Sequence, residues 1–217
     1  MVKYYKCYRV FLSGMLMKVI MYLVYPVCVF LWCSLAFIIS DVGFGNATLG
    51  LMMTAGMMVV AELLLDGFVY GGLLAKDSNK LEYLKTSYRG ISVLKKSLYV
   101  DKLRRLLTLI LVFVMVCGVC NEQISVGRLM SLIFATAMVM ELGLLVVRHF
   151  SSFNWVLILT MVAYPIGMAV GFVAMKLEAI FAVLFLLMLV AAYLICSKIT
   201  LKKAEGSFYD TGVEKVL

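Results

Sequence analysis

Long uninterrupted runs of apolar residues recur along the chain and are separated by polar stretches. A helix needs about 20 apolar residues to cross the roughly 30 Å of hydrocarbon in a bilayer. The runs are continuous, whereas the strands of a membrane barrel alternate apolar and polar positions. The pattern therefore predicts an all-α, polytopic membrane bundle. Its six expected spans cover residues 19–39, 47–75, 98–120, 129–147, 155–175 and 179–197.

The third expected span is the least apolar of the six. Its uncharged part, residues 106–120, is short for a membrane crossing. We therefore expect the helix to begin one or two turns earlier. Lys102, Arg104 and Arg105 would then extend their charged ends to the membrane interface.

Composition supports the same class. Hydrophobic residues make up 65% of the 217 residues and charged residues only 15%, whereas soluble domains are about half apolar and a quarter charged. The length suits one membrane domain, residues 1–217, without a second soluble domain. We expect a multi-pass protein of the cell (plasma or inner) membrane.

The positions of lysine and arginine predict the orientation, because cytoplasmic loops carry an excess of both. With the N- and C-termini both cytoplasmic, only Arg128 and Lys176 of the 20 basic residues lie outside. The net charge of +8 then lies mostly at the inner face, where anionic lipids attract it. Membrane lipids are the expected partners of these charges, and nucleic acid is not.

Three polar segments are expected on the cytoplasmic side: an N-terminal segment 1–18, a loop 76–97 and a tail 198–217 without a clear pattern. In a helix, residues 1–18 would have one basic face and one aromatic face, which suits an amphipathic helix in the headgroup plane. A simple basic topology anchor explains the same charges. The basic arc contains Lys3, Lys6, Arg9 and Ser13, and the opposite arc contains Tyr4, Tyr5, Tyr8, Phe11, Leu12 and Met15.

The loop 76–97 is the longest connection between expected spans. Asn79 followed by Glu82 resembles a capping box at the start of a short helix. Gly90 interrupts this helix, and a second helix capped by Ser92 would lead into the third span. The first helix would have an ordered apolar row, which indicates that the headgroup region or a cytoplasmic partner docks there. That row consists of Leu81, Leu84, Tyr88 and Ile91.

This arrangement resembles the membrane (permease) subunit of ABC transporters of the type-2 exporter class. That family has an interfacial N-terminal helix, six spans and a coupling helix between spans two and three. The matching residues here are KDSNKLEYLK (76–85), TSYRGIS (86–92) and VLKKSLYVDK (93–102). Two features depart from the family: Tyr88-Arg89-Gly90 stands where a proline step is usual, and no extracellular element precedes the last span.

The resemblance implies a permease subunit of an ATP-driven exporter in a bacterial membrane. Two copies of the chain would pair and bind two copies of a separate ABC ATPase. The chain contains no phosphate-binding loop, so ATP and Mg would be held by that partner. We expect no enzymatic activity, cofactor, catalytic residue or metal ligand in this chain. The expected ATPase-coupling residues are Leu81, Glu82, Leu84, Lys85, Tyr88 and Arg89.

Three carboxylates lie inside expected spans: Glu62 and Asp66, one helical turn apart, and Glu141. Ionisable residues at such depth usually face the protein interior or a water-filled path. We therefore name all three as candidates for a translocation pathway. The alternative is a structural role, with the carboxyl groups neutral or hydrogen-bonded to neighbouring Tyr, Ser or Asn side chains.

Two other functions agree with the same sequence. A proton-coupled secondary carrier would use Glu62 and Asp66, and a membrane scaffold or immunity protein would bind a partner without transport. An intramembrane enzyme is disfavoured, because the chain lacks a G-x-S-x-G motif and a paired-aspartate span. The sequence does not indicate a substrate, and peptides, lipids, drugs and ions all remain open.

Overall fold

The computed structural model describes residues 2–12, 14–41, 47–71, 73, 89–119, 124–149, 153–176 and 180–213. Nearly all of these residues are helical and none of them forms a strand, so the predicted all-α class is confirmed. The elements are α1 (Val2–Phe11), α2 (Met15–Val19), η1 (Ile20–Val24), α3 (Tyr25–Asp41), α4 (Ala47–Tyr70), α6 (Gly90–Val119), α7 (Val126–Val147), α8 (Phe153–Lys176) and α9 (Ile180–Val213).

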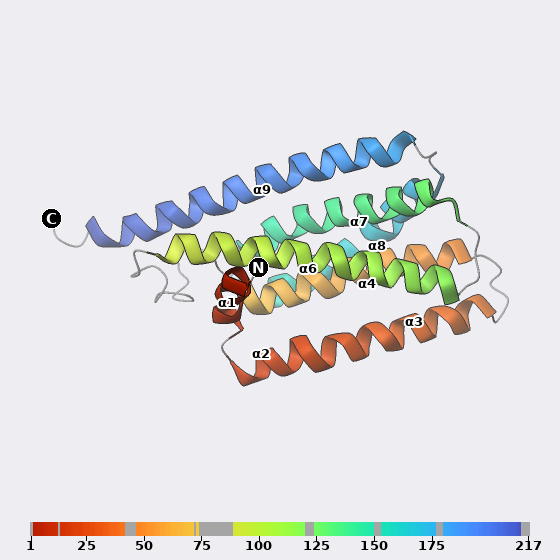
Figure 1. Ribbon diagram of the computed structural model, residues 1–217, viewed down its shortest axis with the longest axis horizontal. Coiled ribbons are helices and arrows are strands. Elements are labelled where there is room, and N and C mark those ends of the chain that lie inside the picture. Colours follow the sequence, from red (N-terminus) through yellow and green to blue (C-terminus); the bar gives the residue numbers. More distant parts are fainter. Residues whose placement is uncertain are drawn as a thin grey trace.

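The long helices run side by side and alternate in direction (Figure 1). α2, η1 and α3 follow one another as one continuous helical stretch. The short helix α1 crosses this direction and packs on α6. It lies toward the end of the bundle where α4 ends and α6 begins, which we call the α1 end. The C-terminal end of α9 projects beyond the bundle on that side (Figure 1).

The chain is a multi-pass membrane protein. Within the described residues, five helices are long and apolar enough to cross a bilayer. α6 differs, because its uncharged part after Arg105 covers only 14 residues to Val119, about 21 Å of helix. The count of six spans depends on α6 and stays a prediction. The five stretches are Met15–Leu35, Leu49–Tyr70, Val126–Val147, Asn154–Lys176 and Phe181–Lys202.

The N-terminal segment 1–18, expected as one interfacial helix, contains two helices. Gly14 has an extended backbone (φ −70°, ψ 140°), and α2 starts directly after it at Met15. Of the expected aromatic face, Phe11 and Leu12 are buried, while Met15 is 83% exposed. Met15 therefore belongs to the first apolar stretch rather than to the helix that lies on α6.

A turn of π-helix, η1, precedes Pro26. Proline lacks the backbone N–H and its ring clashes with the carbonyl four residues earlier in an α-helix. A wider turn before the proline relieves this clash. α3 then continues to Asp41 without a break.

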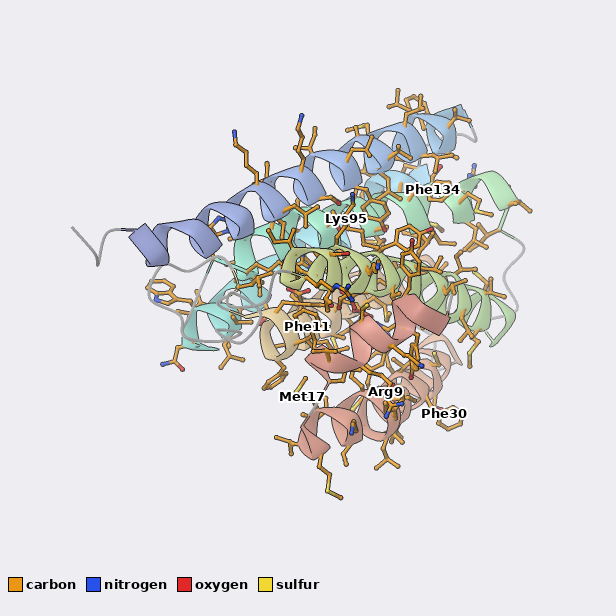
Figure 2. All side chains as sticks on the ribbon, turned by 60° about the vertical axis from the view of Figure 1, so that its left-hand side comes forward. Arg9, Phe11, Met17, Phe30, Lys95 and Phe134 are labelled. Atoms are coloured by element: carbon orange, nitrogen blue, oxygen red, sulfur yellow. The ribbon has the colours of Figure 1, made fainter. Side chains whose placement is uncertain are left out.

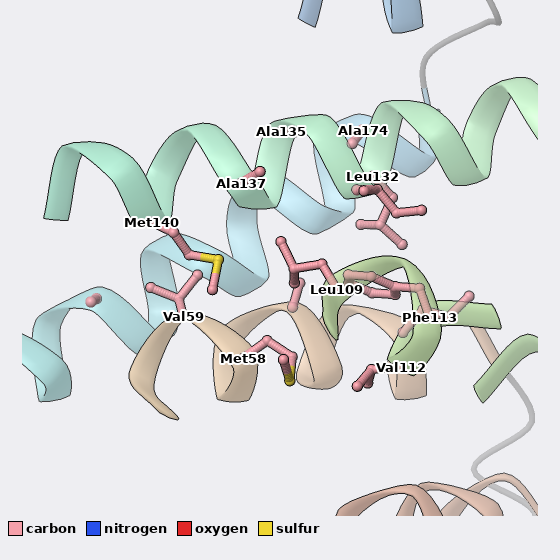
Figure 3. Close-up of a cluster of buried hydrophobic side chains, with 14 of the residues drawn as sticks. Met58, Val59, Leu109, Val112, Phe113, Leu132, Ala135, Ala137, Met140 and Ala174 are labelled. Atoms are coloured by element: carbon pink, nitrogen blue, oxygen red, sulfur yellow. The ribbon is translucent and has the colours of Figure 1, made fainter. Parts of the chain in front are cut away.

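Burial divides the helices into an interior pair and a surrounding set. In the apolar stretches of α4 and α7, 61% and 56% of residues are buried, against 11%, 28% and 17% in the first, fourth and fifth stretches. α4, α6, α7 and α8 together enclose the largest apolar core, part of which Figure 3 shows. The surrounding helices expose apolar side chains all along their outer faces, which requires lipid as the solvent.

Glycines allow α4 and α8 to approach closely, and the sequence analysis did not single them out. A Cβ on Gly167 would lie 2.9 Å from Cα of Gly56, and one on Gly56 would lie 2.9 Å from the Tyr164 carbonyl oxygen. Gly167 and Gly171 also form a G-x-x-x-G pattern on α8. Small residues at this spacing are typical of membrane helix interfaces.

Helix bounds differ from the expected segments at the α1 end. α6 begins at Gly90, inside the expected loop 76–97. Ser92 therefore lies in its first turn rather than at its cap, and the Val93 N–H already donates to the Arg89 carbonyl. α9 continues through most of the expected tail, to Val213.

Candidate functional site

The three intramembrane carboxylates predicted from the sequence are all buried. Glu62, Asp66 and Glu141 are 0%, 1% and 2% exposed. Of the expected coupling residues, Arg89 is described and lies exposed in a turn directly before α6. The other five lie outside the described residues: Leu81, Glu82, Leu84, Lys85 and Tyr88.

Glu62 and Asp66 belong to a buried ion-pair network that joins α4, α6 and the C-terminal end of α7. Three acidic and three basic side chains take part, so their formal charges cancel. The members of the ion-pair network are Glu62, Asp66, Asp101, Arg104, Arg105 and Arg148. Glu141 forms a separate buried ion pair with Lys102.

Glu62 is held from two sides. Arg104 Nη1 and Nη2 donate to Glu62 Oε1 and Oε2 at 3.0 and 2.5 Å, a bidentate pair. The Tyr25 hydroxyl donates to Oε1 at 2.5 Å, and Arg105 Nε lies 3.3 Å from Oε2. Bidentate arginine–carboxylate pairs are stronger and better oriented than single charged contacts. Glu62 thus joins α3, α4 and α6.

Asp66 holds two arginines from different helices. Arg148 Nε and Nη2 donate to Asp66 Oδ2 and Oδ1 at 3.0 and 2.7 Å. Arg105 Nη2 donates to Oδ1 at 2.5 Å. Arg105 also forms an ion pair with Asp101, one turn earlier on α6. All four side chains are nearly inaccessible, so each charge depends on the others for its compensation.

The separate Glu141–Lys102 pair joins α7 and α6 to α9. Lys102 Nζ lies 2.5 Å from Glu141 Oε1. It also donates to Ser197 Oγ at 2.6 Å and to the Tyr193 carbonyl at 3.1 Å. One ammonium group therefore holds α6, α7 and α9 together.

Apolar groups enclose the network from both ends. The large core of Figure 3 lies on one side. Toward the α1 end, Phe11 packs on Tyr70 with ring centroids 5.1 Å apart, and the Tyr70 and Ser97 hydroxyls are 2.6 Å apart. Tyr8 on α1 is 3% exposed. Burial, and then the nearby Asp101 charge, raise the pKa of the Tyr8 hydroxyl, so it stays neutral beside the network.

Lys102, Arg104 and Arg105 do not extend to the membrane interface as the sequence predicted. Their side chains are 12%, 21% and 4% exposed and point into the bundle. These side chains turn inward because a buried carboxylate without a charged partner costs far more free energy than a paired one. Glu62 lies eight residues before the end of α4, about 12 Å along the helix axis. A carboxylate at this depth indicates that the cations that pair with it must also reach into the bundle.

Tyr25 offers a direct measure of what the network contributes. Tyr25→Phe removes the hydrogen bond to Glu62 and is expected to lower the free energy of unfolding by about 1.5–3 kcal/mol, because the acceptor is charged and buried. SDS titration of the detergent-solubilised protein measures this. Tyr22→Phe is the control, since the Tyr22 hydroxyl meets only the Tyr5 hydroxyl at an exposed position. Equal losses in both variants would contradict the assignment.

The arrangement can couple the helices mechanically. The buried ion pairs join arginine and lysine side chains of α6 and of the end of α7 to carboxylates of other helices. Among the described residues, no three His, Cys, Asp or Glu side chains are placed to hold a metal ion.

Comparison with known proteins does not assign the chain to a family. No family model matches it, and no curated protein and no solved structure matches it either.

Proposed function

We propose that the chain is the permease subunit of an ATP-driven exporter. In this proposal it has six spans with both termini cytoplasmic, and it moves substrate outward when a separate ATPase subunit hydrolyses ATP. Two copies of the chain would act with two ATPase subunits, which hold ATP and Mg.

One observation carries the proposal: the helices that flank the expected coupling segment are joined by buried ion pairs. α4 ends at Tyr70 and α6 begins at Gly90, and the segment 74–88 connects them. Glu62 on α4 is bound to Arg104 on α6, and Asp66 is bound to Arg105. A force applied to the segment 74–88 would therefore move α4 and α6 together.

The N-terminal helix supports the same proposal. α1 packs on α6 through Tyr8 and Phe11, at the level of the network. A docked partner that moves α6 would move α1 with it. In this mechanism Glu62, Asp66 and Glu141 act as connectors between moving helices, while a direct role in the translocation pathway remains a prediction.

A proton-coupled carrier is the second candidate, and the ion pairs weigh against it. Protonating Glu62 would remove the bidentate partner of Arg104 and leave it only Asp101 at 3.3 Å. Protonating Asp66 would leave Arg148 without its ion-pair partner. Leaving a buried charge uncompensated costs about 3–5 kcal/mol. Transport by the purified chain alone in liposomes, driven by a pH gradient without ATP, would favour the carrier and contradict the exporter.

The partner is the first test. The tagged chain is extracted in mild detergent from the cells that make it, and co-purifying chains are identified by mass spectrometry. We expect an ATPase subunit with a phosphate-binding loop in equimolar amount. An intact chain that carries no ATPase would contradict the proposal and favour a scaffold or immunity protein.

The coupling segment gives the second test, by Leu81→Ser, Leu84→Ser and Tyr88→Ser together. Losing three apolar contacts of this size is expected to weaken ATPase binding by about tenfold or more. ATP-driven export falls accordingly. The control is Asn79→Ser with Thr86→Ser, on the opposite arc of the predicted helix. Unchanged binding in the triple variant would contradict the expected coupling role.

A further inference from the structure

A groove of about 1000 Å³ lies between α1, α6 and α9 at the α1 end. It is at the upper end of the size range of small-molecule sites, about 300–1,000 Å³. Tyr4 and Tyr5 from α1 form one wall, α6 forms the floor, and Ser197 and Leu201 from α9 form the other wall. In Figure 2, Lys95 lies where α6 faces α9.

One end of the groove is basic. Lys95, Lys96 and Ser92 line it, and none of its described lining residues is acidic. Lys96 Nζ lies 5.9 Å from the centre of the Tyr4 ring. In the part of the chain that the structure describes, no carboxylate comes within ion-pair distance of Lys95 or Lys96. No described carboxylate therefore compensates the charge of either lysine.

The other end of the groove is apolar and electrically neutral. Leu98, Val100 and Leu103 line it on α6, and Leu201 on α9. Lys102 also reaches the groove, but its charge is compensated by Glu141 at 2.5 Å. The distance along α6 from Lys96 to Leu103 is about 10 Å. The groove thus combines a compact cationic site with an elongated apolar channel.

The level of the groove along the bundle matches the edge of a bilayer. The apolar stretch of α9 ends at Lys202, and Leu98 packs in the same apolar cluster as Leu201. Lys95 and Lys96 lie one turn further out on α6, at headgroup level. Lysines and tyrosines are the residues expected at this level.

We propose that this groove is a binding site for an anionic phospholipid. The headgroup phosphate lies between Lys95 and Lys96, and an acyl chain lies along Leu98, Leu103 and Leu201. Charge complementarity selects an anionic head, and the apolar channel selects an acyl chain over a free anion. The bound lipid would fill the gap between α6 and α9, which otherwise meet through Lys102 and Ser197.

Native mass spectrometry of the full chain in detergent tests this proposal. Phosphatidylglycerol and phosphatidylcholine with identical acyl chains are titrated separately. We expect phosphatidylglycerol to bind about tenfold tighter, since each lysine near an anionic headgroup contributes measurably. Lys95→Gln with Lys96→Gln is expected to abolish this preference, and Lys95→Arg with Lys96→Arg is expected to retain it.

The matched control is Lys198→Gln with Lys202→Gln. These lysines are exposed on α9 near the same end of the bundle but do not line the groove. The control is expected to bind phosphatidylglycerol as the wild type does. Equal loss in both pairs would overturn the proposal in favour of diffuse surface charge. Equal binding of both lipids by the wild type, or displacement by millimolar inorganic phosphate, would also overturn it.

Discussion

Asp66→Asn is expected to destabilise the protein by about 3–5 kcal/mol, the largest effect of any single substitution considered. Both carboxylate oxygens of Asp66 accept hydrogen bonds from Arg148, and one of them also accepts a hydrogen bond from Arg105. Asparagine keeps the size and one acceptor oxygen but removes the charge. The network would then hold three cations against two anions in a buried site. The midpoint of SDS-induced unfolding in mixed micelles measures the loss.

A second variant distinguishes charge balance from simple loss of contacts. Asp66→Asn combined with Arg148→Gln removes one anion and one cation, and Arg105 keeps its ion pair with Asp101. We expect this double variant to recover most of the lost stability. Arg128→Gln is the control, because Arg128 is exposed at the other end of α7, and it should change stability by less than about 0.5 kcal/mol. A single variant as stable as the wild type would contradict the network.

Gly167→Ala is expected to destabilise the contact between α4 and α8 by about 1–3 kcal/mol. The added Cβ would lie 2.9 Å from Cα of Gly56, and backbone atoms cannot rotate away as a side chain can. Gly56→Ala is expected to behave alike, because its Cβ meets the Tyr164 carbonyl oxygen at 2.9 Å. Thermal unfolding in detergent, followed by circular dichroism, measures both.

Gly50→Ala, on α4 with Gly56, provides a control in which the stability change is expected to have the opposite sign. Among the described residues, no atom lies within 4 Å of a Cβ at Gly50, and alanine is about 1 kcal/mol more favourable than glycine inside a helix. We expect Gly50→Ala to leave stability unchanged or raise it. If Gly56→Ala and Gly50→Ala shift the unfolding midpoint in the same direction, the result would contradict the role of Gly56 in the close approach of α4 and α8.

Sequence reasoning found three of the buried carboxylates but not their partners. Glu62, Asp66 and Glu141 stand out because each interrupts a long apolar run. The cations of α6 stand at the start of a run, where an interfacial position is the ordinary expectation. Their true position depends on which way α6 faces and how far it reaches into the bundle. Neither quantity follows from apolar periodicity, because a membrane helix is apolar on every side.

The glycine contacts were missed for a related reason. Glycine is frequent in membrane helices, and its presence does not identify the helix that approaches it. Gly56 and Gly167 become informative only once α4 and α8 are seen to pack together. The same holds for the groove, whose lining comes from segments more than 90 residues apart, such as Tyr4 and Ser197.

The length and continuity of the apolar runs predicted the all-α class and indicated five apolar helices long enough to cross a membrane. These features are visible locally because a helix that crosses hydrocarbon must be apolar along its length. The pairing of Glu62 with Arg104, Asp66 with Arg148 and Lys102 with Glu141 required the packed bundle. Helix rotation and neighbour choice arise from contacts between distant segments. Local composition carries no record of those contacts, so the partners of the buried carboxylates emerge only when the helices are assembled.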